Sequence, residues 1–134
     1  MKLAIIGDGK MGRAVAALAA DRGITVTKIV GVEENRGGAG ITRALLGEPD
    51  VAVEFTEPEA AASNAIACAR AGIPVVVGTT GWYDALVTVT AEVERHRGAL
   101  LWAPNFSFGV AVLTAAVEAV ASALRGAEGF DVHL

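Results

Sequence analysis

The opening residues constrain the fold of this chain more than any other segment. Residues 2–6 form a short apolar run typical of a β-strand, and a Gly-Asp-Gly-Lys-Met-Gly sequence follows directly at residues 7–12. Small and apolar residues then recur with helical spacing over residues 11–22. A G-x-G-x-x-G sequence between a strand and a helix is typical of the turn that begins a dinucleotide-binding β-α-β unit. We therefore predict an α/β fold that begins with such a unit.

Each glycine of this turn has a physical role in the predicted unit. Gly7 permits the tight bend, Gly9 lets the backbone approach a pyrophosphate, and Gly12 lets the helix pack closely on the strand. The free N–H groups at the start of the helix, together with the positive end of its dipole, would face the phosphates. The alternative is a tight turn with only a structural role. We predict a dinucleotide bound by the turn residues Gly7, Asp8, Gly9, Lys10, Met11 and Gly12.

Strand-like and helix-like patterns alternate along the rest of the chain. The predicted strands cover residues 25–32, 51–55, 73–77 and 99–102, and residues 130–134 resemble the start of a sixth. The predicted helices cover residues 58–71, 84–97 and 109–125, with a shorter one at 41–46. Repeated strand-helix units imply parallel strands joined by right-handed crossovers. We therefore predict that residues 1–134 form a single domain with a doubly wound, Rossmann-type parallel sheet.

The composition fits this fold and argues against several classes of function. Hydrophobic residues make up 53% of the chain and aromatic residues 5%, which suits buried parallel strands and the helices that cover them. The net charge of -4, without a basic stripe, argues against nucleic-acid binding. No apolar run approaches the ~20 residues of a membrane span, and the chain starts with a strand rather than a signal peptide. We therefore expect a soluble, cytoplasmic protein.

The chain has one cysteine, Cys68, which lies in an alanine-rich predicted helix. We expect it to be a small buried apolar residue rather than a reactive thiol. A single cysteine forms no disulfide within the chain. The histidine, cysteine and acidic residues do not have the spacing of metal ligands, so we predict no metal site.

Glu33 is the candidate residue for binding the adenosine ribose. It lies next to the end of the second predicted strand, 21 residues beyond Gly12, where an acidic side chain commonly binds the ribose hydroxyls. Glu34 adds a second negative charge that would repel a 2′-phosphate, whereas Arg36 would attract one. These residues favour NADH as the cofactor and leave NADPH open. In the alternative interpretation, both glutamates are solvated loop residues.

Four blocks of sequence, in the same order, resemble the N-terminal half of dihydrodipicolinate reductase. The first is the glycine turn with the arginine after it, and the others read Glu-Phe-Thr-Glu-Pro-Glu, Val-Gly-Thr-Thr-Gly-Trp and Ala-Pro-Asn-Phe-Ser-Phe-Gly-Val. They occupy residues 7–13, 54–59, 77–82 and 103–110, so the resemblance extends over essentially the whole chain. Each block follows a predicted strand, so all four would lie at the carboxyl edge of the sheet, where doubly wound folds bind their ligands.

The resemblance implies a role for the second and third blocks in binding the cofactor. Phe55 and Thr56 would lie near the pyrophosphate and the adenosine. The resemblance also implies that Gly78, Thr79 and Thr80 surround the nicotinamide ribose. Their hydroxyls and backbone donors are compatible with ribose or anionic oxygens. In the family, the second threonine of this block, here Thr80, also lies close to a substrate carboxylate.

The fourth block would bind the nicotinamide end of the cofactor. The resemblance implies that the backbone from Ala103 through Pro104 and Asn105 to Phe106 holds the carboxamide, with the Phe106 ring limiting which face of the nicotinamide is open. From the residues alone, Asn105 and Ser107 are expected to cap the helix that follows. Both interpretations can hold together.

The resemblance implies an NAD(P)H-dependent reductase of lysine and diaminopimelate biosynthesis. Such an enzyme transfers hydride to the cyclic imine formed from 4-hydroxy-tetrahydrodipicolinate, and its full-length members are tetramers assembled through a second domain. In the family, the strand equivalent to residues 130–134 leads into a Glu-x-His-His-x-x-Lys segment that serves proton transfer. This chain does not contain that segment, and His133 precedes its expected place, so we predict no catalytic residue here. We expect these 134 residues to be monomeric and to bind a dinucleotide weakly, without turnover.

Two other functions are open at this point. A stand-alone module could bind NADH without catalysis, and a coding sequence that stops after Leu134 would favour it. A different reductase of aspartate-derived metabolites could use the same fold, although the third and fourth blocks argue against it. The family often has an arginine where this chain has Glu34, which places NADPH dependence in question.

Overall fold

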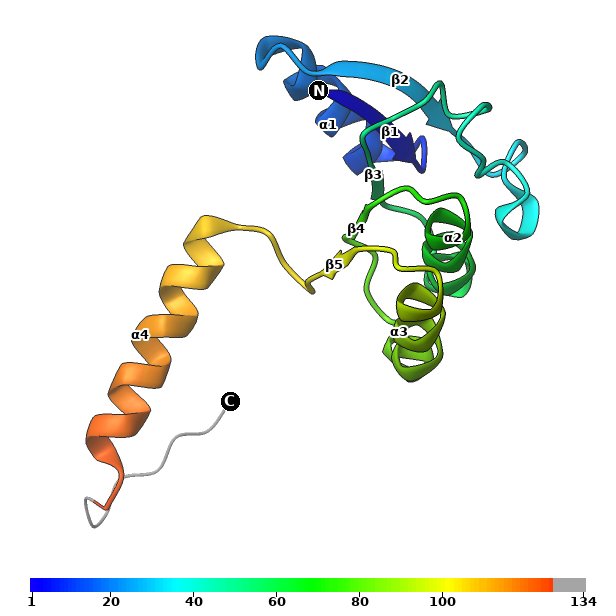
Figure 1. Cartoon of the computed structure of the whole chain (residues 1–134). Helices are drawn as coiled ribbons and strands as arrows, with labels where there is room; N and C mark the ends of the chain where they lie inside the picture. The colour runs from blue at the N-terminus through cyan, green and yellow to red at the C-terminus, as the bar shows by residue number, and fades with distance from the viewer. Residues whose placement is uncertain (127–134) are drawn as a thin grey trace. The chain divides into compact units, whose positions relative to one another are not determined.

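Five short strands form one parallel sheet in the first of two units of this chain (Figure 1). The computed structural model describes residues 1–126; the first unit covers residues 1–104, and the second begins at Asn105. Neighbouring strands all pair in parallel. The predicted α/β class with a parallel sheet is therefore confirmed. The strands, in chain order, are β1 (Lys2–Ile6), β2 (Thr25–Val30), β3 (Val51–Glu54), β4 (Val75–Val77) and β5 (Leu100–Trp102).

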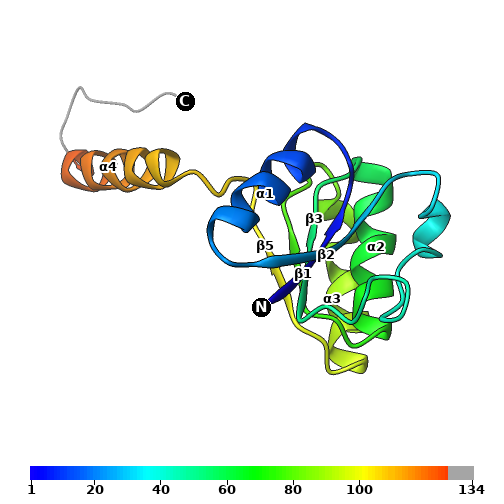
Figure 2. The same cartoon turned by 90° about the horizontal axis from the view of Figure 1, so that it is seen from above.

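Helices cover both faces of this sheet (Figure 2). α1 (Lys10–Asp21) lies on one face, and α2 (Pro58–Arg70) and α3 (Leu86–Arg95) lie on the other. Two single turns of 3-10 helix, η1 (Arg36–Gly38) and η2 (Tyr83–Ala85), precede β3 and α3. α2 begins at the predicted proline, which is tolerated in a first helical turn because its missing N–H has no partner there.

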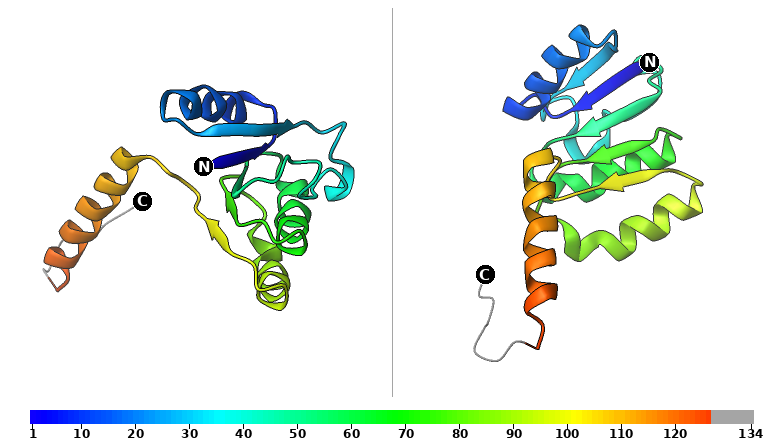
Figure 3. Two further views of the ribbon diagram at one scale, coloured as in Figure 1. Left: turned by 45° about the horizontal axis from the view of Figure 1, so that its top comes forward. Right: turned by 90° about the vertical axis from the view of Figure 1, so that its left-hand side faces the viewer.

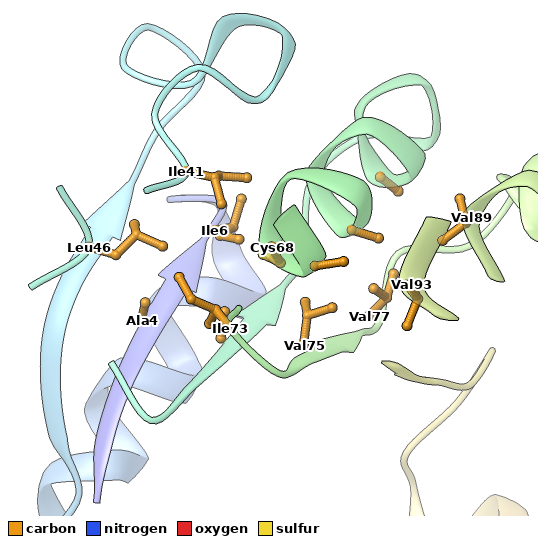
Figure 4. Packing of buried hydrophobic residues seen from close by; sticks show 14 of the residues in the cluster. Ala4, Ile6, Ile41, Leu46, Cys68, Ile73, Val75, Val77, Val89 and Val93 are labelled. Atoms are coloured by element: carbon orange, nitrogen blue, oxygen red, sulfur yellow. The ribbon is translucent and has the colours of Figure 1, made fainter. Parts of the chain in front are cut away.

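Strand β1 separates the two hydrophobic cores. Because successive side chains of a strand point to opposite faces, Leu3 and Ile5 pack with Ala19 of α1. Ala4 and Ile6 point the other way, into the larger core beneath α2 and α3 (Figure 4). Both faces of the strand are thus apolar, as is typical of a parallel sheet covered by helices on both sides.

The strand order β2-β1-β3-β4-β5 determines where a ligand can bind. The chain passes from β1 outward to β2 and then returns to the opposite side of β1 to form β3. Doubly wound folds bind ligands at the carboxyl edge of the sheet, at the point where the order reverses, which here is between β1 and β3. Because the strands are parallel, the loops after β1, β3 and β4 share this edge (Figure 3).

The predicted helix at residues 41–46 is wrong. Turns occupy this segment, and they end where Gly47 and Glu48 both adopt the left-handed conformation, with φ of 76° and 54°. The guanidinium of Arg43 stabilises the loop by donating hydrogen bonds to the carbonyl oxygens of Pro49 and Gly72, at 3.1 and 3.2 Å. Six residues with a left-handed exit are too few for an independent helix. The predicted sixth strand and His133 lie outside the described residues.

Cys68 lies in α2 and is buried in the larger core, as predicted. Removal from water raises the pKa of its thiol to about 12, with a smaller contribution from the negative charge of Glu54. The thiol is therefore protonated at neutral pH and packs as an apolar group.

The second unit is described as far as residue 126 and contains α4 (Phe108–Leu124). Ser107 is the N-cap residue of this helix, and its hydroxyl accepts a hydrogen bond from the N–H of Val110 at 3.5 Å. The side-chain oxygen of Asn105 accepts from the N–H of Ser107 at 2.6 Å. The predicted capping role is thus confirmed for Ser107, whereas Asn105 binds the N–H of the N-cap residue and no N–H of the helix itself. Over residues 1–126, no helix has the length and apolar character needed to cross a membrane.

Candidate functional site

Two adjacent pockets lie at the carboxyl edge of the sheet. One, of about 370 Å³, lies between the glycine turn, the end of β2 and the start of α2. The other, of about 510 Å³, lies between the glycine turn, the start of α2 and the loop after β4. Gly9, Phe55, Thr56 and Glu57 line both pockets, so the two form neighbouring parts of one surface. The second pocket also brings together the predicted residues Lys10, Met11, Gly78, Thr79 and Thr80.

Two of the three glycines in the first turn are required by the packing of the protein, and the third is not. Gly7 has a φ of 109°, and a Cβ atom there would overlap the carbonyl oxygen of Phe55. A Cβ atom at Gly12 would overlap the carbonyl oxygen of Gly7. Gly9, in contrast, has an ordinary extended backbone, and a Cβ atom there would meet nothing within 4 Å. The packing of the protein explains Gly7 and Gly12, whereas the open space at Gly9 is available to a ligand.

Phe55 connects the two glycine loops. Its N–H donates to the carbonyl oxygen of Ile6 at 2.8 Å, which continues the β1–β3 pairing past the end of β3. A Cβ atom on Gly78 would overlap the Phe55 ring and would lie 2.7 Å from its Cδ1 atom. The backbone of Phe55 therefore abuts the first glycine loop while its ring abuts the second, so this single residue contacts both loops.

Thr79 binds to the protein itself. Its hydroxyl accepts a hydrogen bond from the N–H of Thr56 at 2.8 Å and donates to the Thr56 carbonyl oxygen at 3.2 Å. Its own carbonyl oxygen accepts from the indole N–H of Trp82 at 2.9 Å, and only 7% of the residue is exposed. Thr80 is exposed. The hydroxyl of Thr79 thus holds the loops after β3 and β4 together, while Thr80 faces solvent; contact of either with a nicotinamide ribose stays a prediction.

Two positive charges lie in the first turn of α1. Lys10 and Arg13 occupy this turn, which contains no acidic residue. Cations are unfavourable at a helix N-terminus, because the helix dipole is positive there. Arg13 partly offsets this by donating from Nε to the carbonyl oxygen of Asp8 at 2.7 Å. A bound phosphate group would turn the remaining repulsion into attraction.

Acidic residues surround the other end of the site. Glu33 pairs with Arg36 at 2.6 Å, with both side chains nearly four-fifths exposed. Glu34 pairs with Lys28 at 2.9 Å. Glu33, Glu34 and Asp8 line a further pocket of about 500 Å³ at the end of β2, together with one cation, Arg13. The candidate ribose-binding residue is therefore accessible, and its ion pair is weak enough to exchange for a ligand.

The predicted carboxamide-binding segment is divided between the two units. Ala103 and Pro104 end the first unit, where the N–H of Ala103 donates to the Val77 carbonyl oxygen at 3.4 Å. Asn105 and Phe106 belong to the second unit. The binding of a nicotinamide carboxamide by these four residues stays a prediction.

Sequence reasoning missed three buried polar residues beneath the pockets. Asn35, Glu54 and Asn64 are joined by hydrogen bonds, and Asn35 and Asn64 line the smaller pocket. The available signal was weak: a glutamate ending an apolar strand, and an asparagine within an alanine-rich helix. No group of three histidine, cysteine or acidic residues among residues 1–126 could hold a metal ion.

Comparisons with known proteins identify related sequences. The family described as dihydrodipicolinate reductase, N-terminus, matches residues 1–106. A 4-hydroxy-tetrahydrodipicolinate reductase from Christiangramia forsetii is 31% identical over 135 residues, which cover 100% of this chain and 54% of the relative. The protein of the same name from Thiobacillus denitrificans is 36% identical over 153 residues, with 100% and 56% covered. This chain thus spans about half the length of the curated relatives it matches.

A solved structure shares the fold. It is the crystal structure of a protein from Archaeoglobus fulgidus, provisionally named homoserine dehydrogenase, with a TM-score of 0.54 at 17% sequence identity. The match covers 76% of this chain and 42% of that chain. At this identity the likeness concerns the fold alone.

The contact between Phe55 and Gly78 predicts a rescue by complementary substitution. Gly78 has no positive φ, so Gly78→Ala suffers only from overlap with the ring, and we expect it to lower the free energy of unfolding by about 1–3 kcal/mol. In a Phe55→Val background, which removes the ring, the same change should cost much less. Urea unfolding of the four proteins measures this difference.

Gly7→Ala is the matched control for this rescue. Its Cβ atom would overlap the backbone of Phe55, and its φ is positive, so Phe55→Val should leave its cost unchanged. Equal costs of Gly78→Ala with and without the ring would contradict the proposed contact.

Proposed function

This chain belongs to the dihydrodipicolinate reductase family, and from that premise we propose that it binds NADH or NADPH along the carboxyl edge of its sheet. The observation that carries the proposal is the open space at Gly9, between a turn that the protein's own packing requires and a helix start with excess positive charge. A pyrophosphate fits this place, because the backbone N–H groups and the helix dipole both favour an anion. Phe55 and Thr56 would line its path on the opposite side.

The activity of the whole protein is part of the same proposal. Two similar proteins are named 4-hydroxy-tetrahydrodipicolinate reductase, and we infer the same reduction, in lysine and diaminopimelate biosynthesis in the cytoplasm, for the enzyme to which these residues belong. A bound nicotinamide would supply the hydride for a cyclic imine. Gly78 and Thr80 would orient the nicotinamide ribose, Thr80 would also bind a substrate carboxylate, and residues 103–106 would hold the carboxamide. A tetramer is proposed for the full-length enzyme.

The charges around the adenosine end support a preference for NADH. Asp8, Glu33 and Glu34 line one pocket there, and Glu57 and Glu59 line the next. The 2′-phosphate of NADPH would place further negative charge among these carboxylates, whereas the ribose hydroxyls of NADH can donate hydrogen bonds to one of them. Arg13 also lines the first pocket, where its charge is outnumbered by the three carboxylates and its Nε donates to the Asp8 carbonyl oxygen. Arg36 is the cation closest to Glu33 in sequence, and its charge is offset by its ion pair with Glu33.

Gly9→Val tests the proposed dinucleotide site directly. Because the valine side chain would meet no protein atom near its Cβ, the variant should fold with an unchanged thermal midpoint, yet it should bind NADH at least about tenfold more weakly. Calorimetric titration of NADH into the 134-residue chain measures the affinity, and Gly9→Ala should give an intermediate value. Wild-type affinity in a folded Gly9→Val protein would refute the site.

Lys10→Gln should separate stability from binding. Removing a cation from the first turn of α1 relieves its repulsion with the helix dipole, so the free energy of unfolding without ligand should rise by about 0.3–1 kcal/mol. The affinity for NADH should fall, and its salt dependence should weaken, because one positive charge near the phosphates is lost. Thermal unfolding and NADH titration at two salt concentrations measure both effects.

The control for Lys10→Gln is Lys2→Gln, which changes the same charge at the opposite end of β1. It should alter neither NADH affinity nor its salt dependence. A fall in the unliganded stability of Lys10→Gln would show that Lys10 is not destabilised by the dipole of α1.

Glu33→Gln should change the preference between cofactors. It removes the candidate ribose acceptor and releases Arg36 from its ion pair, so NADH should bind more weakly and the NADPH-to-NADH affinity ratio should rise by roughly tenfold. Adding Arg36→Gln should cancel the gain for NADPH. Paired titrations with both dinucleotides give the ratio.

Glu34→Gln is the matched control, because it removes the same negative charge from a neighbouring residue that pairs with Lys28 and not with Arg36. Its effect on the ratio should be clearly smaller than that of Glu33→Gln. Equal effects of the two substitutions would mean that general charge, and not a ribose contact by Glu33, determines the preference.

A further inference from the structure

Three loops of the candidate site rest on one network of buried polar side chains. It joins Asn35, in the loop after β2, to Asn64 in α2, and Asn64 to Glu54 and Thr56 at the end of β3. We propose that Glu54 and Asn64 are positioning residues that hold the loops after β2, β3 and β4 in the arrangement that binds a dinucleotide. This inference rests on the proposed dinucleotide function.

The network is continuous, and its two central residues are shielded from water. The amide nitrogen of Asn64 donates to Glu54 Oε1 and to the Thr56 hydroxyl oxygen, each at 3.2 Å, and the Thr56 hydroxyl donates to the same Glu54 oxygen. The amide nitrogen of Asn35 donates to Asn64 Oδ1 at 2.8 Å. Glu54 and Asn64 are 0% and 1% exposed.

The acceptor oxygen of Glu54 determines the orientation of both amides in this network. A carboxylate only accepts hydrogen bonds, so Asn64 must turn its NH₂ group toward Glu54. Its oxygen then faces Asn35, which must in turn offer its own NH₂ group. One carboxylate therefore specifies side-chain orientation across three separate elements of the fold.

Stability alone does not account for this arrangement. Glu54 Oε2 and Asn35 Oδ1 are buried without a hydrogen-bond partner among the described residues, and each such atom costs free energy. The hydrogen bonds to Glu54 come from a hydroxyl and an amide, so no cation offsets its buried charge through them. Apolar side chains of similar size often stabilise such a core more than a buried charge does. The network therefore has a cost that a role in positioning the loops explains.

The network reaches both pockets through its two ends. Asn35 and Asn64 line the smaller pocket beside Gly9, on the adenosine side. Thr56 lines both pockets, and its backbone is held by the hydroxyl of Thr79 in the loop after β4. A change of hydrogen-bond direction at Asn64 should therefore disturb the adenosine side and the nicotinamide side together.

Exchanging the two functional groups tests this proposal. Asn64→Asp places a second carboxylate against Glu54, and we expect at least about tenfold weaker NADH binding, because two acceptors repel each other. The double variant Glu54→Gln with Asn64→Asp keeps the net charge and reverses the donor and acceptor. It should restore NADH affinity to within about threefold of wild type. Glu54→Gln alone should have a small effect, because its oxygen can still accept.

Two readouts separate positioning from simple stabilisation. NADH affinity is measured by calorimetry at a temperature where each variant is folded, as judged by circular dichroism. Amide hydrogen exchange at Thr56, whose N–H is bonded to Thr79, reports the loop contact without any ligand. We expect faster exchange in Asn64→Asp and wild-type exchange in the double variant. If Asn64→Asp does not fold, the double variant decides, since a folded double variant with wild-type affinity and exchange supports the proposal.

The outcomes distinguish this inference from the proposed function. A folded double variant with weakened NADH binding, or an Asn64→Asp protein that is less stable but binds NADH normally, overturns the positioning role. A wild-type chain that binds neither NADH nor NADPH overturns the proposed function instead. In that case the exchange rates at Thr56 still decide whether Glu54 and Asn64 hold the loops together.

Discussion

The close approach of β3 to both glycine loops is the constraint on which the rest of the site depends. Phe55 pairs with β1 through its N–H, abuts Gly7 through its carbonyl oxygen and abuts Gly78 through its ring. In a parallel sheet the strands end at one edge, so a bulky residue at the end of the central strand lies between the loops on either side. Phe55 also lines both pockets, so the residue that contacts both loops borders the whole candidate site.

Features that oppose local stability are concentrated at this edge of the sheet. The first turn of α1 contains cations where the dipole is positive, and Glu54 is a buried carboxylate whose second oxygen has no partner among the described residues. Away from this edge, in contrast, the strands pack ordinary apolar side chains (Figure 4). Proteins commonly depart from locally favourable choices at functional sites, and here the departures occupy the same edge as the pockets.

Sequence periodicity predicted the sheet and the main helices, because apolar spacing reports which face of an element is buried. It was wrong at residues 41–46, where left-handed residues and the hydrogen bonds of Arg43 maintain a turn. It also missed Glu54 and Asn64, because a polar residue within an apolar pattern shows neither its burial nor its partner. Only the fold brings together residues 10 positions apart and reveals that they form one network.

The motifs of this chain contain residues that the protein's own packing requires and residues that are open to a ligand, and a sequence motif does not distinguish the two. Gly7, Gly12 and Thr79 are required by contacts within the protein, whereas Gly9 and Thr80 leave space or exposed groups at the same loops. The first kind shapes the loops, and the second meets whatever binds there. A substitution at Gly7 or Thr79 would therefore alter binding through the fold, and one at Gly9 would alter it with the fold intact. Of the two glycines in the opening G-x-G, only Gly9 can therefore be substituted to test ligand binding without disturbing the fold.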